Sequence, residues 1–473
     1  MKAKSLLFVF VFTLFAATGE SPCGAADYPW KASVARRDIT PEENVWMAGY
    51  AARKGPSEKV QQRIFAKALA LEDADGGRLV CITMDLIGVP KDLRLAVEKH
   101  AGESHSLPPG SLVINASHTH CGPMIRLYRK PGSDTLLAPY PKVPDDQQEL
   151  RVKQTTAYRS RLQEALCELI DETLGKFEPA TLQFSKAKCG FAMNRRSPLP
   201  NGDWKNSPNP DAPVDHEVPV LQILDAEDNL KCLIFGYACH ATTLSVMEIN
   251  GDWPGYAQHY FEAEHPGTTA MFLNGASADQ NPYPRRLQHY VERHGQSMAT
   301  AIEAALGTTP IPISGPIKAA IAWPEINYQD PPSRRDLEAN ANSSDTSDAR
   351  HAQFLLEVLD VTGTLPGSYP VPVQVVRFGD SLTLITMGGE VVVDYALRLK
   401  QEIGEKTSGA PVWFSGYCND VMTYIPSRRV LEEGGYEGGG AMRHIRSTVH
   451  PAPWEFEIEE KLVSKIHELF ESE

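Results

Sequence analysis

The sequence has no C-x-x-C pair, no internal repeat, no excess of basic residues and no long hydrophobic run beyond its first residues. The lack of a second apolar run of about 20 residues excludes a bundle of transmembrane helices. The lack of paired cysteines excludes a cysteine zinc ribbon. A net charge of −14 argues against nucleic acid or an anionic lipid surface as a partner, because both are negatively charged. What is present is a chain of 473 residues, 42% hydrophobic and 22% charged, which is ordinary for a globular protein.

The N-terminus has the pattern of a secretory signal. Lys2 and Lys4 precede an apolar run over residues 6–17, and residues 24–26 are small and suited to cleavage. The run is short for a membrane span, so we expect a signal peptide over residues 1–26 and a soluble, secreted or periplasmic mature protein without a transmembrane segment. An uncleaved anchor is the alternative. Removal of the signal takes away two lysines and one glutamate, which changes the net charge from −14 to −15.

Cysteine usage gives no disulfide framework. Seven of the eight cysteines follow the predicted signal, an odd number. Cys81 and Cys232 lie in apolar, strand-like runs and are expected to be inert core thiols. The other five cysteines could include one disulfide, but the sequence does not show which two would pair.

Hydrophobic periodicity over residues 27–473 predicts one large mixed α/β (α+β) domain, with mixed sheets flanked by helices. The expected strands cover residues 65–71, 78–86, 112–114, 182–184, 218–224, 231–239, 269–273, 371–378, 381–387 and 411–417. The expected helices cover residues 90–100, 155–174, 255–264, 287–306, 391–403 and 458–470. Because α/β proteins assemble their sites where strands end, we expect the site at strand ends.

Two polar segments interrupt this pattern. Residues 124–147 carry four prolines and no clear period, which indicates a surface loop near the site. Residues 325–351 form a polar stretch that is either a mobile lid or a disordered insertion. The lack of an aromatic, histidine or cysteine between residues 330 and 350 favours the disordered insertion.

The stretch SLVINASHTHCGP (111–123) delivers two histidines to the end of a strand. If the backbone stays extended through Thr119, His118 and His120 point to the same side and share one cavity. Neutral imidazole is the commonest zinc ligand, so this pattern is compatible with the start of a metal site. An ordinary polar loop explains an isolated H-x-H equally well.

A second histidine, His240, follows the strand KCLIFGYAC in the same way, although a lone histidine there is more often structural. Nearby Asp252 either holds the free ring nitrogen of a metal-bound histidine or caps the helix at 255–264. Glu390 follows two glycines and is either a metal ligand or a capping acid at the start of the helix at 391–403. The loop FLNGASADQNPYPR, which contains Asn281, either lines a pocket or turns the chain.

Together, the motifs NASHTHCGP, MNRR, CHATT, GDWPGYA, GASADQNP, GGE and NDVMTYI occur in an order that resembles the neutral/alkaline (non-lysosomal) ceramidase family. Members of that family are zinc amidases that cleave the amide bond of ceramide to give sphingosine and a fatty acid. The likeness runs from about residue 33 to residue 440. The ordered set is far more specific than any one of the motifs.

The resemblance implies roles for individual residues. The family's zinc ligands match His118, His240, Glu390 and Tyr424, and its substrate-contacting residues match His120, Arg195 and Tyr436. This implies a Zn²⁺ cofactor that activates water, a proton shuttle at His120 and an oxyanion partner in Arg195 or Tyr436. Tyrosine is an uncommon zinc ligand, so the alternative is that Tyr424 forms part of the wall of the pocket and does not bind the metal.

The chain departs from the family pattern in two places. Asn281 stands where the family has a serine often assigned as nucleophile or essential, and Ser277 lies too early in the motif to take its place. The family usually continues into a C-terminal immunoglobulin-like domain, whereas this chain ends 49 residues after Tyr424. We therefore expect a zinc hydrolase that cleaves an amide of a small-molecule, lipid-like or water-soluble N-acyl compound. The alternatives are an esterase or deacylase at the same site, and an inactive ceramidase-like protein that binds a lipid or glycan.

Overall fold

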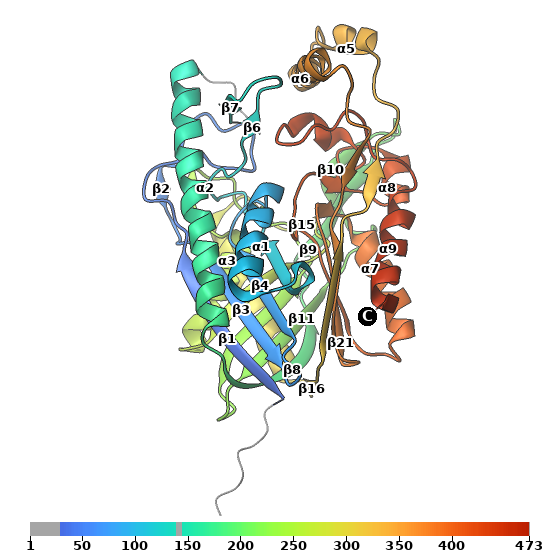
Figure 1. Cartoon of the computed structure of the whole chain (residues 1–473). Coiled ribbons are helices and arrows are strands. Elements are labelled where there is room, and N and C mark those ends of the chain that lie inside the picture. The colour runs from blue at the N-terminus through green and yellow to red at the C-terminus, as the bar shows by residue number, and fades with distance from the viewer. Residues whose placement is uncertain (1–28, 139–143, 473) are drawn as a thin grey trace, which may run out of the picture.

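The computed structural model of the protein describes residues 29–138 and 144–472, and the predicted signal peptide lies outside these residues. The chain forms four layers, in which two β-sheets pack face to face and helices cover the outer face of each sheet (Figure 1). The predicted mixed α/β architecture with helices flanking the sheets is therefore confirmed.

The larger sheet has nine strands among the described residues, most of them antiparallel. The predicted hairpin of residues 65–86 is confirmed, because β3 and β4 pair antiparallel and the Asp73 carboxylate accepts the backbone N–H groups of Asp75 and Gly77 in the turn. In order across the sheet the strands are β14 (Thr269–Asn274), β12 (Leu230–Tyr237), β11 (Glu217–Leu224), β8 (Glu178–Lys188), β1 (Trp30–Asp38), β3 (Phe65–Asp73), β4 (Arg78–Met84) and β5 (Leu112–Ala116), with β16 (Ile311–Ile313) paired to β8.

The smaller sheet packs against one face of the larger one. Its strands in order are β17 (Ile317–Ala322), β20 (Val373–Phe378), β21 (Leu382–Met387) and β23 (Val412–Ser415). Large side chains from both sheets, among them Trp30, Phe184, Phe378 and Trp413, are buried between them. Burial of apolar surface on this scale is the main source of stability for the sandwich.

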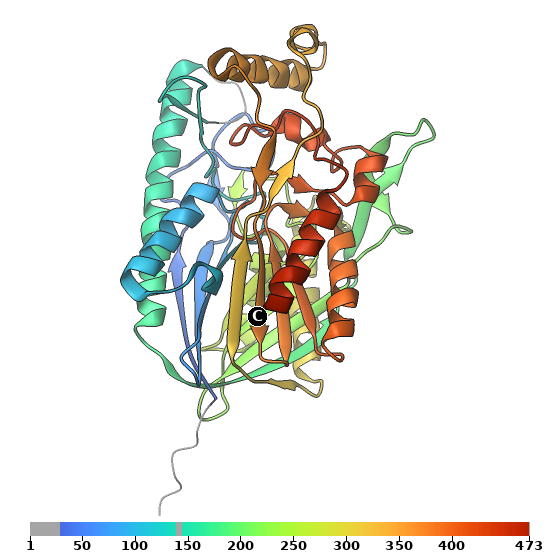
Figure 2. The same ribbon diagram turned by 45° about the vertical axis from the view of Figure 1, so that its right-hand side comes forward.

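Helices cover both outer faces because each presents an apolar stripe to its sheet. On α9, for example, Leu462, Val463, Ile466 and Phe470 recur at helical spacing and are buried. Figure 2 shows this helix lying over the smaller sheet. The larger sheet is covered by α1 (Lys91–His105), α2 (Asp145–Leu174), α3 (Asp252–Glu264) and α4 (Gln288–Leu306), and the smaller sheet by α7 (Val393–Lys406) and α9 (Ile458–Ser472).

Short elements lie between these layers and around the sandwich. They are β2 (Lys59–Val60), β6 (Tyr128–Arg129), β7 (Leu136–Leu137), β9 (Ala192–Pro198), β10 (Trp204–Asn209), β13 (Glu248–Ile249), β15 (Gln280–Pro282), β18 (Glu325–Asn327), β19 (Ser368–Pro370), β22 (Glu390–Val391), β24 (Tyr424–Ile425), η1 (Pro109–Ser111), α5 (Arg334–Asn340), α6 (Thr346–Thr362), α8 (Arg428–Glu433) and η2 (Gly440–His444). The seven cysteines of the described residues are all free thiols, six of them buried.

Parallel strand pairs bring three chain segments to one end of the sandwich. β4 pairs parallel with β5, β12 with β14, and β21 with β23. Beyond β23, the backbone N–H of Asn419 donates to the carbonyl of Ile114 in β5 at 2.8 Å, and Ser415 Oγ donates to the carbonyl of Asn274 at 2.8 Å. The carboxyl ends of strands from both sheets are thus tied together, and the loops that follow them meet.

The prediction that residues 325–351 form a disordered insertion is wrong. This stretch contains β18, α5 and the start of α6. Ser333 and Asp336 form a capping box at α5, and Asp345 caps α6, so the polar residues serve as helix ends. Leu337 packs with Leu355 and other apolar residues of α6 that lie beyond residue 351, which the composition of the polar stretch alone did not include.

The described parts of the predicted surface loop at 124–147, from which residues 139–143 are left out, also differ from the prediction. Met124 and Ile125 are buried, and the segment includes the short strands β6 and β7. The helix expected at 155–174 begins at Asp145, ten residues earlier, as α2. Four prolines interrupt any period here, but the last of them directly precedes α2, where a missing N–H costs no intrahelical hydrogen bond.

The stability of the protein is expected to depend on pH through a buried histidine near the C-terminal end, His450. His450 is fully buried, with Nδ1 2.9 Å from the Tyr328 hydroxyl, and burial lowers its pKa to about 3. The unfolded chain takes up this proton near pH 6.5, so the free energy of unfolding falls between about pH 6.5 and pH 3, by about 1.4 kcal/mol per pH unit. Urea unfolding at several pH values is expected to show this slope. In the variant His450→Gln the slope of the unfolding free energy against pH is expected to be shallower by about 1.4 kcal/mol per pH unit. An unchanged slope in the variant would contradict the assignment.

Candidate metal centre

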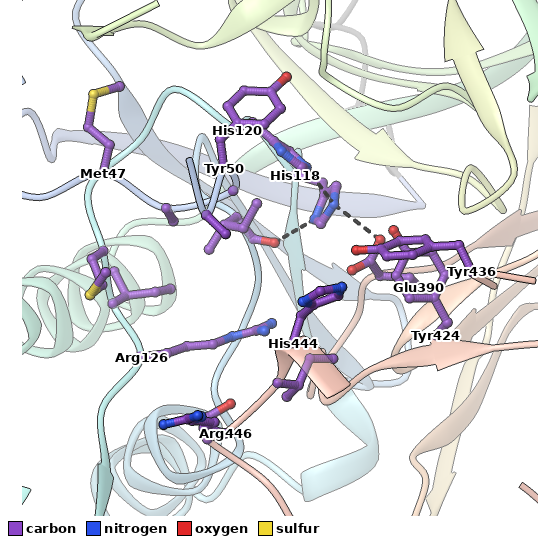
Figure 3. Close-up of a pocket in the computed structure, with 18 residues that line it drawn as sticks. Met47, Tyr50, His118, His120, Arg126, Glu390, Tyr424, Tyr436, His444 and Arg446 are labelled. Atoms are coloured by element: carbon purple, nitrogen blue, oxygen red, sulfur yellow. Dashed lines mark hydrogen bonds and ion pairs between the residues drawn. The ribbon is translucent and has the colours of Figure 1, made fainter. Parts of the chain in front are cut away.

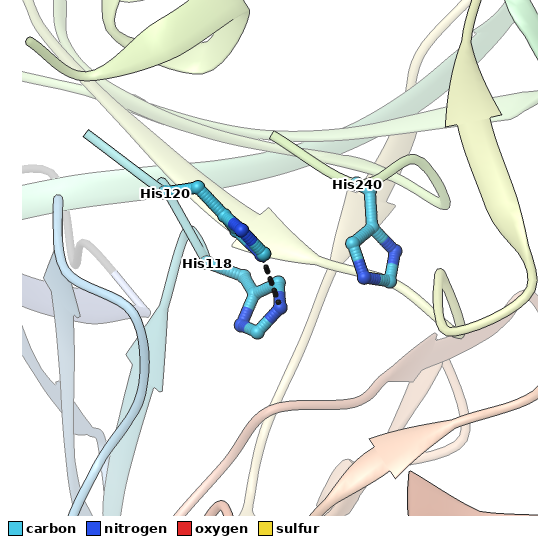
Figure 4. Close-up of side chains that lie close together, drawn as sticks. All are labelled: His118, His120 and His240. Atoms are coloured by element: carbon cyan, nitrogen blue, oxygen red, sulfur yellow. Dashed lines mark hydrogen bonds between the residues drawn. The ribbon is translucent and has the colours of Figure 1, made fainter. Parts of the chain in front are cut away.

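His118 and His120 lie in the loop that follows β5, and their rings approach each other (Figure 4). His118 Nε2 is 3.1 Å from His120 Nε2. The predicted extended backbone is wrong, because His118 has a φ of 62°, in the left-handed region. The rings meet because of this turn. Non-glycine residues with a left-handed backbone conformation are concentrated at functional sites. Gly49 leaves room for the loop, since a Cβ there would lie 2.5 Å from the His120 ring.

His240 follows β12, a strand that does not pair with β5, and its ring lies 4.8 Å from the His118 ring. Its Nδ1 lies 2.6 Å from the carbonyl oxygen of Ser277, and His118 Nδ1 lies 2.6 Å from the carbonyl oxygen of Ile87. A carbonyl oxygen only accepts, so in both rings Nδ1 carries the hydrogen and Nε2 carries a lone pair. This is the way in which metal-binding histidines are usually held.

Glu390 brings a carboxylate to the two Nε2 atoms. It lies on β22, which pairs in parallel with β24 and places Glu390 beside Tyr424. Glu390 Oε2 is 3.2 Å from His118 Nε2 and 3.4 Å from His240 Nε2. The alternative of a helix-capping acid is wrong, because α7 begins only at Val393, after Val392.

These atoms form a set of acceptors without a matching donor. His240 Nε2 and Glu390 Oε2 are buried and have no hydrogen-bond partner. Burial lowers the pKa of His240 to about 3, so its imidazole is neutral near pH 7. Facing lone pairs and a carboxylate repel one another unless a cation lies between them.

The His118, His120 and His240 ring nitrogens lie within 4.8 Å of one another, and this buried group could bind a metal ion. A second group of similar size, His100, His105 and Asp171, lies on α1 and α2. There both imidazole Nε2 atoms contact one Asp171 oxygen, at 2.7 and 2.6 Å, so imidazole donors and a carboxylate acceptor match. Only the first group, among the described residues, combines three histidines with orphaned acceptors.

Arg195 connects the remaining predicted site residues. From β9, its Nε donates to Glu437 Oε1 at 2.8 Å, one terminal nitrogen donates to the Tyr424 hydroxyl at 3.0 Å, and the other lies 3.4 Å from Asn281 Oδ1. The Tyr436 ring is 5.3 Å from the Tyr424 ring and is partly exposed. The structure thus gathers all the predicted site residues around one point.

Ser277 is buried in the loop after β14, and Asn281 is buried on the short strand β15. Asn281 Oδ1 accepts a hydrogen bond from Thr242 Oγ1 at 3.2 Å, and its amide nitrogen lies 3.3 Å from Asn206 Oδ1. Ser277 contributes its backbone carbonyl to His240. Neither residue reaches the surface of the pocket described below, and Asn281 acts as a link between Thr242 and Arg195.

Asp252 has neither of the two predicted roles. It is the first residue of α3, and Gly251 occupies the N-cap position. Its carboxylate accepts the backbone N–H groups of Thr243 and Leu244 at 3.0 and 2.9 Å. Asp252 therefore holds the loop that follows His240, while the His240 ring is held by Ser277.

Sequence reasoning missed two residues of the site. Glu437 directly follows Tyr436 and lies between Arg195 and Arg196, with both contacts at 2.8 Å. Tyr417 is fully buried with its ring 4.7 Å from the His118 ring and has a φ of 56°. An acidic residue next to a predicted site tyrosine was a signal for Glu437. For Tyr417 the sequence gives no such signal, because its apolar neighbours read as a strand that the structure ends at Ser415.

Removal of the Glu437 charge is expected to destabilise the fold. The side chains of Glu437, Arg195 and Arg196 are at most 5% exposed, so Glu437→Gln leaves the buried Arg195 without its carboxylate partner and Arg196 with Glu433 alone. Breaking a buried pair in this way costs about 3–5 kcal/mol. The matched control is Glu432→Gln, whose pair with Arg428 is more than half exposed and is worth at most about 1 kcal/mol. Urea unfolding of both variants measures the difference, and equal losses would contradict the buried pair.

A pocket of about 310 Å³ opens beside the cluster formed by His118, His120, His240 and Glu390 (Figure 3). His118, His120 and Glu390 lie on one side of it with Tyr424 and Tyr436. Apolar side chains from the loops after residues 46 and 86 and from residues 124–125 form another side, and residues 444–447 close it. Its size suits a small ligand or a short chain.

Comparison with known proteins places this arrangement in a family. Residues 30–282, more than half of the chain, match the family model "Neutral/alkaline non-lysosomal ceramidase, N-terminal". The chain belongs to the neutral/alkaline non-lysosomal ceramidase family. The predicted resemblance is therefore confirmed.

Individual ceramidases match over different lengths. The neutral ceramidase of Pseudomonas aeruginosa is 22% identical over 493 aligned residues, which cover 89% of this chain and 70% of that protein. The neutral ceramidase of Drosophila melanogaster is 24% identical over 254 residues, 51% of this chain and 33% of that protein. The crystal structure of the Pseudomonas enzyme matches 93% of this chain and 74% of its own with a TM-score of 0.69 at 18% identity, so the two share a fold. In the described part of the chain, no helix is long and apolar enough to cross a membrane.

Proposed function

We propose that the protein is a zinc-dependent hydrolase that cleaves the amide bond of an N-acyl compound. The observation that carries this proposal is the buried set of acceptors at the cluster, where the lone pairs of His118 and His240 face the Glu390 carboxylate at 3.2 and 3.4 Å. Two neutral imidazoles and a carboxylate are a ligand set that zinc prefers. Membership of the ceramidase family supports an amide as the bond that is cleaved.

His118, His240 and Glu390 would hold the metal, with the Tyr424 hydroxyl as a fourth donor. Burial and the Glu390 charge raise the pKa of Tyr424 well above its ordinary value, so its hydroxyl is neutral in the metal-free protein. Arg195 donates to that hydroxyl at 3.0 Å and holds the oxygen in place, which suits a ligand role. When bound, zinc polarises a carbonyl and lowers the pKa of water to about 7.

The other residues of the site would bind the substrate and move a proton. His120 faces the pocket, and burial lowers its pKa well below the usual value, so it is neutral and able to take up a proton and pass it to a leaving nitrogen. Arg195 and Tyr436 carry donors that can stabilise negative charge on the carbonyl oxygen. Hydrolysis then needs no serine nucleophile, which agrees with Asn281 at the family's serine position.

We also infer that the protein is exported, on the strength of the signal pattern over residues 1–26. A small lipid-like or water-soluble molecule is the proposed substrate, because the pocket volume of about 310 Å³ suits such a ligand.

A panel of matched amides and esters tests the proposal. Zinc-loaded protein is expected to hydrolyse N-acyl amides, and a chelator to remove the activity. Faster cleavage of the matching esters would favour the esterase alternative. Zinc-loaded protein that binds members of the panel without cleaving any would favour an inactive binding protein. Inhibition by a serine-directed phosphonate without any effect of chelation would contradict the proposed mechanism.

A further inference from the structure

The three histidines of the cluster are held in two different ways. His118 and His240 each donate from Nδ1 to a backbone carbonyl oxygen at 2.6 Å. Nδ1 of His120 is buried and has no hydrogen-bond partner in the described part of the chain. Its Nε2 lies 3.1 Å from His118 Nε2, but in the proposed function the lone pair of that atom binds zinc and is not free to hold a second ring. Packing, and not a hydrogen bond, therefore has to fix the orientation of the His120 imidazole.

That packing comes from residues 49 and 50, which lie beside His120 in the pocket (Figure 3). The centre of the Tyr50 ring is 4.8 Å from the centre of the His120 ring, and the two planes are tilted by 55°. Rings at this separation and tilt attract each other. A Cβ on Gly49 would lie 2.5 Å from the His120 ring, so the backbone at residue 49 limits the ring from a second direction.

Tyr50 is itself anchored at its hydroxyl. The hydroxyl donates to the carbonyl oxygen of Leu244 at 2.8 Å and accepts a hydrogen bond from an Arg286 terminal nitrogen at 3.1 Å. Burial raises the pKa of Tyr50 to about 12, so the phenol keeps the hydrogen that it donates. Leu244 belongs to the loop that Asp252 holds through the Leu244 backbone N–H. The orientation of the Tyr50 ring is thus fixed from its far end.

Two arginines complete the support of Tyr50. The Arg53 guanidinium lies 4.9 Å from the centre of the Tyr50 ring and also donates to the backbone carbonyl oxygen of His120 at 2.8 Å. The Arg286 guanidinium lies 5.5 Å from the same centre, and cations are attracted to aromatic rings at such distances. Arg286 has a φ of 85°, a conformation that a non-glycine residue keeps only where its surroundings impose it. Tyr50 and the backbone of His120 are therefore parts of one connected network.

We infer that Tyr50 is a positioning residue, whose ring holds the His120 imidazole in the orientation in which it faces the substrate. The catalytic effect of this role rests on the proposed amidase function. Packing against a ring fixes an imidazole without binding its Nδ1 to an acceptor. His120 differs in this respect from His118 and His240, whose Nδ1 hydrogens are committed to carbonyl oxygens.

Tyr50→Leu removes the ring and tests the role directly. With zinc-loaded protein, kcat for N-acyl amides is expected to fall by about 10- to 100-fold, because a small misplacement of a catalytic group has an effect of this size. KM and zinc content are expected to stay close to those of the wild type. Tyr50→Phe keeps the ring and is expected to retain kcat within about fivefold, because it loses only the hydrogen bonds of the hydroxyl. A raised KM with an unchanged kcat in Tyr50→Leu would make Tyr50 a part of the pocket wall only and would overturn the inference.

A double-mutant cycle shows whether Tyr50 acts through His120. If it does, Tyr50→Leu has no further effect on kcat in the His120→Ala protein, because the group that it positions is gone. Additive losses would mean that the two residues act independently and would also overturn the inference. The matched control is Tyr260→Leu, since the Tyr260 ring on α3 lies 5.7 Å from the ring of the exposed His259. This control is expected to keep the kcat of the wild type.

The position of the His120 ring separates this inference from the proposed function. Crystal structures of the zinc-loaded variants are expected to show the ring turned from its wild-type position in Tyr50→Leu and unchanged in Tyr50→Phe. If zinc-loaded wild-type protein hydrolyses no amide, the amidase proposal fails, and the position of the ring alone decides the inference. A His120 ring that stays in place in Tyr50→Leu would overturn it.

Discussion

Glu390→Gln is expected to lower amide hydrolysis by about a thousandfold and to abolish tight zinc binding. Glu390 supplies the negative charge of the cluster, and its Oε2 lies 3.2 and 3.4 Å from the Nε2 atoms of His118 and His240. A bound metal contributes several kcal/mol of charge stabilisation, and each 1.36 kcal/mol corresponds to about a factor of ten in rate.

The same substitution has an opposite effect on the metal-free protein. In the wild type the carboxylate is buried against two ring nitrogens that only accept. The amide of glutamine brings N–H donors to these atoms, so the free energy of unfolding of metal-free Glu390→Gln is expected to rise by about 1–2 kcal/mol.

Elemental analysis, amide hydrolysis and urea unfolding, each with and without zinc, measure the effects of Glu390→Gln. Glu357→Gln, at an exposed position on α6, is the matched control and is expected to behave as the wild type. Full zinc occupancy in Glu390→Gln would show that the metal centre lies elsewhere.

His120→Ala is expected to lower kcat by about 10²- to 10⁴-fold while zinc remains bound. His120 lies on the pocket side of the cluster, with its ring 4.8 Å from that of Tyr50, and is placed to transfer a proton. Loss of a general acid–base has an effect of this size. Zinc is retained in this account because His118, His240 and Glu390 still hold it.

Metal content decides between two roles for His120, since its Nε2 lies only 3.1 Å from that of His118. Loss of zinc from His120→Ala would make His120 a metal ligand instead of a proton shuttle. The exposed His289 on α4 offers a control, and His289→Ala is expected to keep both zinc and activity.

Much of the fold could be predicted from local patterns, because strands and helices buried in the core show their period in the sequence. The hairpins β3–β4 and β20–β21 and the helix α9 are examples. The structure of residues 325–351 could not be predicted from a local pattern, because their polar side chains cap α5 and α6 while the apolar residues that Leu337 packs against lie beyond the segment. Element ends were also misplaced, as at α2, where a proline before the helix read as part of a loop.

The site was predictable in its residues and less so in its geometry. Ordered motifs pointed to His118, His240 and Glu390 before any contact was known. The turn at His118, with a φ of 62°, depends on how β5 meets the loops of the other strands. Arg126, which lines the pocket, was also not predicted, because its position depends on contacts with Val421 and other residues distant in the sequence.

Titration of metal-free protein with zinc, with amide hydrolysis followed at each addition, tests the central claim most directly. The account predicts that activity is absent without metal, rises in proportion to added zinc and stops rising at about one equivalent per chain. In His240→Ala the same titration is expected to show no rise, whereas the exposed-site control His259→Ala follows the wild type. Full activity of the metal-free protein would contradict the account.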